Sequence, residues 1–296
     1  MELRHLRYFL AVAREGNVTR AAASLHVTQP TLSRQLADLE QELGRELLVR
    51  ESRGVTLTDD GMLLRKRAEE IVALADRTEH ELMGDDSQIE GDVWVGGGET
   101  RTMALVARAM TTIARDHPGV RLRMHSGNAD DIIERVDKGL LDFGVILGRN
   151  PEARFETLSL PSHERWGILV RRDDPLATLD VASLEDLADR RLIVSAQPSD
   201  PSQPTSETEQ LLGELSANVV ATYTLLYNAS LLVEEGFGIA FCLDGIVATG
   251  PETPFAFVPT TLQPLVPTHL IWKRFVPQSR AAALFLRTMR AVCAED

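Results

Sequence analysis

Apolar residues near the start of the chain recur every three or four positions, which predicts three short amphipathic helices. Gly16 is expected to end the first helix, Asn17 to cap the second and Thr28 to cap the third. Pro30 then lies in a first helical turn, where proline is tolerated. The residues predicted to face inward are Leu6, Phe9, Leu10 and Ala13, then Val18, Ala21, Ala22 and Leu25, then Leu32, Leu36, Leu39 and Leu43.

The short turn His26-Val27-Thr28 makes the second and third helices a candidate helix-turn-helix. Short polar groups and one arginine lie outward near the start of the third helix, as the reading of base edges in a DNA major groove requires. The predicted outward and flanking residues are Pro30, Thr31, Ser33, Arg34, Ala37 and Gln41. The alternative is a plain helical hairpin with a solvated polar face.

Residues 46–58 (ELLVRESRGVTLT) are predicted to form two short strands joined by a turn at Ser52-Arg53-Gly54. Such a hairpin beside a recognition helix is a wing. Arg50 and Arg53 would reach the DNA backbone or the minor groove, and a hairpin that only packs in a core needs no arginines there.

A long helix is expected to follow Thr58, which can cap it, with Asp59 and Asp60 in the first turn where the helix dipole favours negative charge. Its apolar positions alternate by four and three residues, as in the seam of a paired helix. The seam residues are Leu64, Ala68, Ile71, Ala75, Thr78 and Leu82. We expect dimerisation through this helix; the alternative is a helix packed on its own domain.

From residue 91 onward, short apolar strands alternate with helices, which predicts open parallel α/β sheets. A first strand, Val93–Val95, leads into Gly96, Gly97 and Gly98, and a helix follows. We expect these glycines to clear space for a ligand at the helix N-terminus. The loop lacks the Walker lysine and the GxGxxG spacing, so nucleotide binding is not expected.

Length and charge fit this division. A chain of 296 residues favours two or three domains, and a content of 44% hydrophobic and 25% charged residues is that of a globular protein. The net charge is −13, yet residues 1–58 hold eight arginines against seven acidic residues. Most of the acidity therefore lies downstream and does not repel DNA from the N-terminal segment. The chain lacks a long apolar run and begins with charges among its apolar positions, so a cytoplasmic protein is expected.

Cofactor and catalytic signatures are missing from the sequence. Cys242 and Cys293 are far apart, and we interpret them as buried structural thiols, with a thiol sensor as the alternative. The histidines His117, His125 and His163 do not share a metal-binding spacing, and no GxSxG motif occurs. We therefore expect no metal, no cofactor and no enzymatic activity.

Residues 19–61, TRAAASLHVTQPTLSRQLADLEQELGRELLVRESRGVTLTDDG, closely resemble the DNA-binding domain of the LysR-type transcriptional regulators. The resemblance implies a winged helix-turn-helix, a dimerising linker helix and an effector domain of periplasmic-binding-protein type. Transferred to this sequence, the resemblance implies that Thr28, which opens the recognition helix, binds DNA together with the groove and wing residues. They are Gln29, Pro30, Thr31, Ser33 and Arg34 for the groove, and Arg50 and Arg53 for the wing.

The resemblance continues through SGNADDIIERVDKGLLDFGVIL, WGILVRRDDPLA and ATYTLLYNASLLVEEGFGIAF, which look like an effector domain of the same family. The expected fold class is α/β, with a helical winged helix-turn-helix domain at the N-terminus and two Rossmann-like α/β subdomains of the type 2 periplasmic-binding-protein kind. The expected domains are residues 1–58 for DNA binding, 59–90 for the linker helix and hinge, and 91–296 for the effector. Within the last, subdomain I is 91–161 with 267–296, and subdomain II is 162–266.

A small-molecule effector is expected between these two subdomains. The candidate contacts are Glu99, Thr100, Arg101, Thr102, Ser126 and Asn128 from the first, and Trp166, Gln197, Tyr223, Tyr227 and Asn228 from the second. The carboxylate of Glu99 would repel an anion unless Arg101 offsets it, so an effector with an amine or several hydroxyls is favoured.

These features predict a regulator that binds promoter DNA sequence-specifically, forms a dimer that assembles into a tetramer, and responds to the effector. RNA polymerase is a further candidate partner, and a membrane is not. Two alternatives stay open: an enzyme with a DNA-binding appendage, and a nonspecific DNA-bridging protein. The large acidic second half disfavours the bridging protein.

Overall fold

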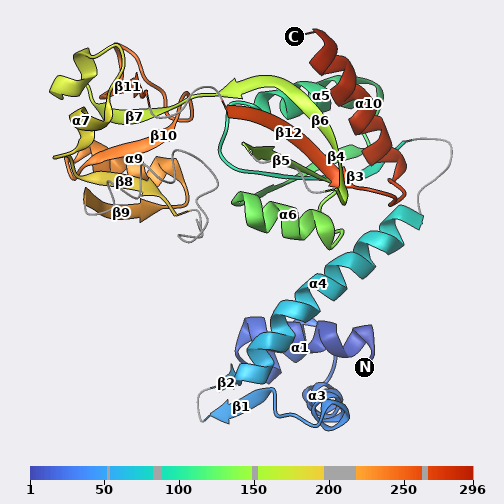
Figure 1. Ribbon diagram of the computed structural model, residues 1–296. Coiled ribbons are helices and arrows are strands. Elements are labelled where there is room, and N and C mark those ends of the chain that lie inside the picture. The colour runs from blue at the N-terminus through green and yellow to red at the C-terminus, as the bar shows by residue number, and fades with distance from the viewer. Residues whose placement is uncertain (52–53, 83–88, 149–152, 197–217, 262–265, 296) are drawn as a thin grey trace. The chain divides into compact units, whose positions relative to one another are not determined.

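The computed structural model describes residues 1–51, 54–82, 89–148, 153–196, 218–261 and 266–295, and the chain divides into two compact units, Met1–Gly84 and Asp85–Asp296 (Figure 1). The first unit contains the predicted helices, the wing and the long helix. Its elements are α1 (Leu3–Glu15), α2 (Val18–Ser24), α3 (Gln29–Leu43), β1 (Leu48–Glu51), β2 (Gly54–Leu57) and α4 (Asp59–Leu82).

The caps expected from the sequence are present in the first unit. Gly16 ends α1 with a φ of 59°, a left-handed conformation that glycine adopts without strain. The side chain of Asn17 accepts from Arg20 N, and that of Thr58 accepts from Gly61 N at 2.9 Å. Thr28 caps α3 by accepting from Thr31 N, and this cap defines where the short turn between α2 and α3 ends.

The core of the first unit confirms most of the predicted inward faces, although five of the predicted positions are not fully buried, among them Val18 and Leu25, which are half-buried and pack against it. Ala11 and Val12 are buried, while Leu10 and Ala13 are only half-buried. Leu43 is 39% exposed, because it is the last residue of α3, directly before the cap Gly44. The fully enclosed side chains come from all three helices and the start of the wing: Phe9, Val12, Ala21, Ala22, Leu32, Leu36, Leu39 and Leu47.

The wing is a two-stranded antiparallel hairpin in which Leu48 pairs with Leu57. Hydrogen bonds attach it to two helices: Val55 N donates to Gly16 O at the end of α1 at 2.9 Å, and Leu47 N donates to the carboxylate of Glu40 in α3 at 2.8 Å. The wing is therefore fixed to the ends of α1 and α3, and β2 lies next to the start of α4 in the same unit.

The first sheet of the second unit has the strand order β4-β3-β5-β12-β6. The helices α5 and α10 pack on one face and α6 on the other (Figure 1). The strands are β3 (Gly91–Gly97), β4 (Val120–Ser126), β5 (Phe143–Leu147), β6 (Phe155–Glu164) and β12 (Val266–Lys273), and the helices are α5 (Met103–Asp116), α6 (Ala129–Asp137) and α10 (Arg280–Glu295).

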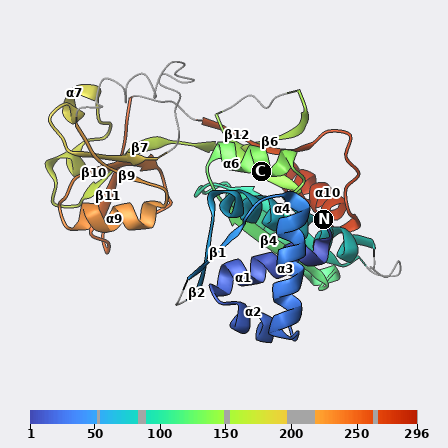
Figure 2. The same cartoon turned by 90° about the horizontal axis from the view of Figure 1, so that it is seen from below.

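The second sheet has the order β11-β7-β10-β8-β9. Figure 2 shows α7 and α9 on opposite sides of it. Its elements are β7 (Trp166–Arg171), η1 (Pro175–Thr178), α7 (Leu184–Leu187), β8 (Leu192–Ser195), β9 (Val219–Tyr223), α9 (Leu226–Glu234), β10 (Ile239–Leu243) and β11 (Phe255–Pro259).

Both sheets correct the expectation of parallel strands, because each is mixed. In the first, β12 runs antiparallel to β5 and β6; in the second, β7 runs antiparallel to β10 and β11. The apolar runs that indicated buried strands do not encode direction, which depends on the path of the chain between them. The first sheet also continues along β6 to Glu164, slightly beyond the boundary expected at residue 161.

The glycines after Val95 were predicted to form a ligand-binding loop, and this was wrong for two of them. Gly96 and Gly97 lie in β3 and pair with β4 and β5. A Cβ at Gly96 would lie 2.5 Å from a methyl carbon of Leu141. These two glycines therefore allow side chains to pack closely on the sheet, and only Gly98 follows the strand.

Candidate DNA interface and effector site

The first turns of α3 present the side chains predicted to contact DNA. Gln29, Pro30, Thr31 and Arg34 are exposed and Ser33 is half-buried, because Leu32, Leu36 and Leu39 on the opposite side are buried in the core. Among the described residues, no carboxylate forms an ion pair with Arg34. Its guanidinium, which carries five donors, is therefore available to an external acceptor.

Local hydrogen bonds order the entry to this helix. The hydroxyls of Thr28 and Thr31 are 2.8 Å apart, and Thr31 N donates to Thr28 Oγ1 at 3.4 Å. Gln29 Nε2 donates to Ser33 Oγ at 3.0 Å. These contacts hold the polar side chains together at the helix N-terminus. The Arg50 side chain and Arg53, predicted to act from the wing, lie outside the described part of the structure.

The turn before α5 carries four of the predicted effector contacts, and its two threonines are not open to a ligand. Thr100 is 9% exposed and Thr102 is 1% exposed. Both hydroxyls donate to the buried carboxylate of Glu164, the Thr102 hydroxyl at 2.6 Å, and Thr102 N donates to the same oxygen at 3.0 Å. Glu164 was not predicted as a site residue, since a single glutamate at the end of a strand of mixed polarity has no distinguishing pattern.

Glu99 and Arg101, from the same turn, contact the second subdomain. The Glu99 carboxylate accepts from Leu226 N at 2.6 Å. Arg101 lies against Gly245, where an added Cβ would be 2.2 Å from the arginine Cδ. The structure thus brings two predicted effector residues next to the second sheet and its helix α9.

Ser126 and Asn128 lie where β4 ends and α6 begins. Ser126 is exposed, and Asn128 caps α6 by accepting from Asp131 N at 2.9 Å. Asp131 also bonds His125, with 2.6 Å between His125 Nε2 and Asp131 Oδ2, and Arg135, whose Nε donates at 2.8 Å. Burial opposes ionisation here, but the hydrogen bonds from His125 and Arg135 outweigh it and lower the pKa of Asp131.

The candidates from the second subdomain have different environments. Tyr223 donates its hydroxyl to Phe241 O at 2.9 Å, and burial raises the pKa of Tyr223. Trp166 is half-buried and stacks on the Phe241 ring at 5.1 Å. Tyr227 and Asn228 are exposed on α9. Gln197 lies outside the described residues, so the structure says nothing about its position.

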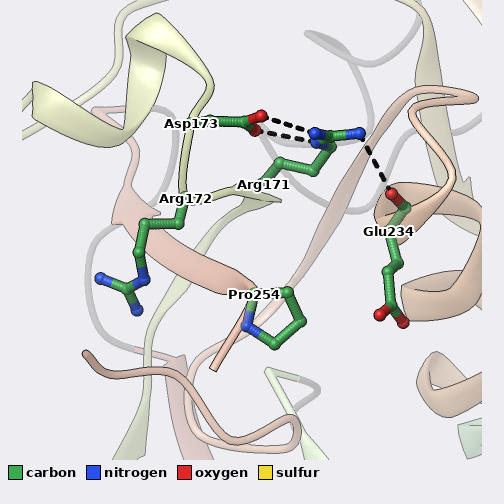
Figure 3. Close-up of a pocket in the computed structure, with 5 residues that line it drawn as sticks. All are labelled: Arg171, Arg172, Asp173, Glu234 and Pro254. Carbon is green, nitrogen blue, oxygen red and sulfur yellow. Dashed lines mark hydrogen bonds and ion pairs between the residues drawn. The ribbon is translucent and has the colours of Figure 1, made fainter. Parts of the chain in front are cut away.

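A separate surface pocket is lined by Arg171, Arg172, Asp173, Glu234 and Pro254 (Figure 3). Arg171 donates to Asp173 through two nitrogens, at 2.8 and 2.5 Å, and lowers the pKa of that carboxyl; Arg172 donates to backbone carbonyls. Both arginines therefore bond groups of the protein itself. None of the residues that line this pocket was predicted as a site residue from the sequence.

The remaining features of the described ranges concern metal ions, membranes and thiols. They contain no group of three or more His, Cys, Asp or Glu residues placed to hold a metal ion. None of the helices described there is long and apolar enough to cross a membrane. Cys242 is buried, which raises the pKa of its thiol, and Cys293 is half-buried.

Comparisons with known proteins match the chain along nearly its whole length. The family model described as "Bacterial regulatory helix-turn-helix protein, lysR family" covers residues 3–62, and the model described as "LysR substrate binding domain" covers residues 86–294. The uncharacterized HTH-type transcriptional regulator YnfL of Escherichia coli (strain K12) is 30% identical over 258 residues, which are 84% of this chain and 80% of that protein.

Two further similar proteins have names that state a function or a partner. The nitrogen assimilation regulatory protein nac of Escherichia coli (strain K12) is 27% identical over 81% of this chain and 77% of that protein. Full-length CbnR, solved in complex with its target DNA, has a TM-score of 0.74 at 22% identity, over 99% of this chain and 100% of that chain. At that identity the likeness to CbnR shows a shared fold.

Proposed function

Because the chain belongs to the LysR family of bacterial transcriptional regulators, with both family domains present, we propose that it reads its promoter through the first two turns of α3. The chain is a DNA-binding regulator with a substrate-binding domain, and the family is one of regulators rather than enzymes.

The exposure of Arg34 carries the DNA part of this proposal. It projects from a helix whose opposite face is buried, without a carboxylate partner in the described residues, and Gln29 and Thr31 flank it. Arginine that donates through two nitrogens to a guanine edge gives about 1–3 kcal/mol of discrimination between bases. Arg50 and Arg53, on or beside the wing strands, would contact phosphates and position the helix.

Measured binding to operator and random duplexes tests these assignments. Arg34→Ala should lower the preference for the operator by about tenfold or more, whereas Arg53→Ala should weaken binding to both duplexes more evenly. Gln41→Ala is the matched control on the same exposed face, further along α3. Equal losses of preference for Arg34→Ala and Gln41→Ala would contradict the assignment of base contacts to the helix start.

For the effector, we place binding between the two subdomains, near the turn before α5 and the start of α9. The contact of Glu99 with Leu226 N supports this, because it joins a candidate of the first subdomain to the residue that directly precedes the candidates Tyr227 and Asn228 of the second. A carboxylate at this place favours an effector with an amine or several hydroxyls. Calorimetric titration of amines, polyols and carboxylates tests the preference, and tight binding of a simple dianion would refute it.

Self-association through α4 completes the proposal. Ile71 and Leu74 are 42% and 44% exposed, and such side chains on a long helix favour pairing with a second copy. The dimer would hold two reading helices over two half-sites and assemble further into a tetramer. We also propose that the protein acts in the cytoplasm, where promoter DNA and RNA polymerase are its partners.

A further inference from the structure

Glu164 is a buried acidic residue at the end of β6, only 3% exposed. One of its carboxylate oxygens accepts three hydrogen bonds from the turn that leads into α5. The donors are the hydroxyl of Thr100, the hydroxyl of Thr102 at 2.6 Å and the backbone N–H of Thr102 at 3.0 Å. The Ser162 hydroxyl oxygen lies a further 3.0 Å from Thr102 Oγ1.

A carboxylate is costly to bury unless several donors replace its hydration shell, and here three donors converge on one oxygen. Two hydroxyls and an N–H at the entry to a helix are also the groups with which proteins bind a free carboxylate or sulfate. In this chain a side chain of the protein itself holds that position.

We propose that Glu164 is a built-in anion that determines specificity: it fills the anion position before α5, so that the effector binds without a carboxylate, sulfate or phosphate group there. The inference rests on the proposed function for the location of the effector. It follows from the contacts of Glu164 alone that removing this side chain should create a site for a small carboxylate.

Acetate is the appropriate probe of that site. Glu164→Ala removes the Cγ carbon and the carboxyl group, and acetate has the same two carbons and the same charge. The full-length variant should unfold at a lower temperature than the wild type, because Thr100 and Thr102 lose their acceptor. Acetate should then raise its Tm by about 2–4 °C, saturably, with chloride at equal ionic strength as the reference.

Three proteins serve as controls. Glu156→Ala removes a carboxylate from the same strand. That carboxylate bonds Arg274 and is not buried, so the Tm of this variant should not respond to acetate. Glu164→Gln keeps the position filled and should not respond either. The double variant Glu164→Ala with Thr102→Val also lacks the Thr102 hydroxyl donor, so it should bind acetate about tenfold more weakly than Glu164→Ala.

Two outcomes would overturn the proposal. One is an acetate response of Glu164→Ala no larger than that of Glu156→Ala. The other is a saturable acetate or sulfate response of the wild type that Thr102→Val abolishes, since the position would then be open. If Glu164→Ala is recovered only unfolded, its refolding yield is the readout: a higher yield in acetate than in chloride supports the proposal, and equal yields contradict it.

This experiment needs neither DNA nor the natural effector. A failure of acetate rescue therefore leaves promoter recognition by α3 untouched. Conversely, if every DNA-contact variant kept its preference for the operator, the result for Glu164 would be unaffected.

Discussion

Glu99 and Leu226, separated by 127 positions in the sequence, are joined by a hydrogen bond of 2.6 Å from the Leu226 N–H to the Glu99 carboxylate. Leu226 is the first residue of α9, and the residue before it, Leu225, has no side-chain acceptor with which to cap the helix. The helix dipole favours a negative charge at this end. Glu99 therefore caps a helix of the second subdomain from the first.

Glu99→Ala should destabilise the second unit by about 1 kcal/mol, as expected for the loss of a helix cap. The Leu226 amide should also exchange its hydrogen faster. Urea unfolding followed by tryptophan fluorescence reports on this unit alone, because Trp94, Trp166 and Trp272 all lie in it. Glu252→Ala, at an exposed glutamate in a turn, is the control; a similar loss there would show that the Glu99 contact has no special weight.

Ile71→Asp should weaken self-association by at least about tenfold, because a charge would be buried in the paired helices. Ala73→Asp adds the same charge on the other side of α4, at another exposed position, and should leave association unchanged. Sedimentation velocity over a range of concentrations measures both. Equal behaviour of the two variants would exclude pairing through the Ile71 face.

Gly61→Ala should destabilise the first unit by about 1–3 kcal/mol, because the new methyl would lie 2.1 Å from the backbone oxygen of Leu47. Gly44→Ala is the comparison: its φ is +64°, but the space around it is open, so only the cost of the left-handed conformation, about 1 kcal/mol, applies. The first unit contains no tryptophan, so its unfolding is followed by circular dichroism and not by tryptophan fluorescence. A smaller loss for Gly61→Ala than for Gly44→Ala would contradict the steric argument.

His269 should make the second unit less stable in mild acid. Burial lowers the pKa of His269, and its Nδ1 is buried without a hydrogen-bond partner among the described residues. As pH falls below about 6.5, the unfolded state takes up the proton first, so stability is full above that pH and declines below it. Unfolding free energies between neutral pH and about pH 5 should therefore fall less steeply in His269→Leu than in the wild type. Parallel pH profiles would disprove this contribution.

Local patterns were sufficient for the first unit. The caps at Gly16, Asn17 and Thr58 and the buried face of Leu32, Leu36 and Leu39 depend on residues within a few positions of one another. Helical periodicity and turn chemistry express such short-range constraints directly. The pattern along α4 could not separate residues that pair with a second copy from residues that pack on their own unit. Ala68 is buried in its own unit, and Leu64 packs on the same core.

By itself, the sequence determined the order of helices and strands, the helix-turn-helix with its wing and the α/β character of the rest, since each depends on neighbouring residues. Only the tertiary structure decided strand direction, the packing role of Gly96 and the partners of Glu99 and Glu164. Those features are contacts between segments far apart in the chain. A hydrophobic pattern predicts that a residue is buried, but it does not predict which residues it contacts.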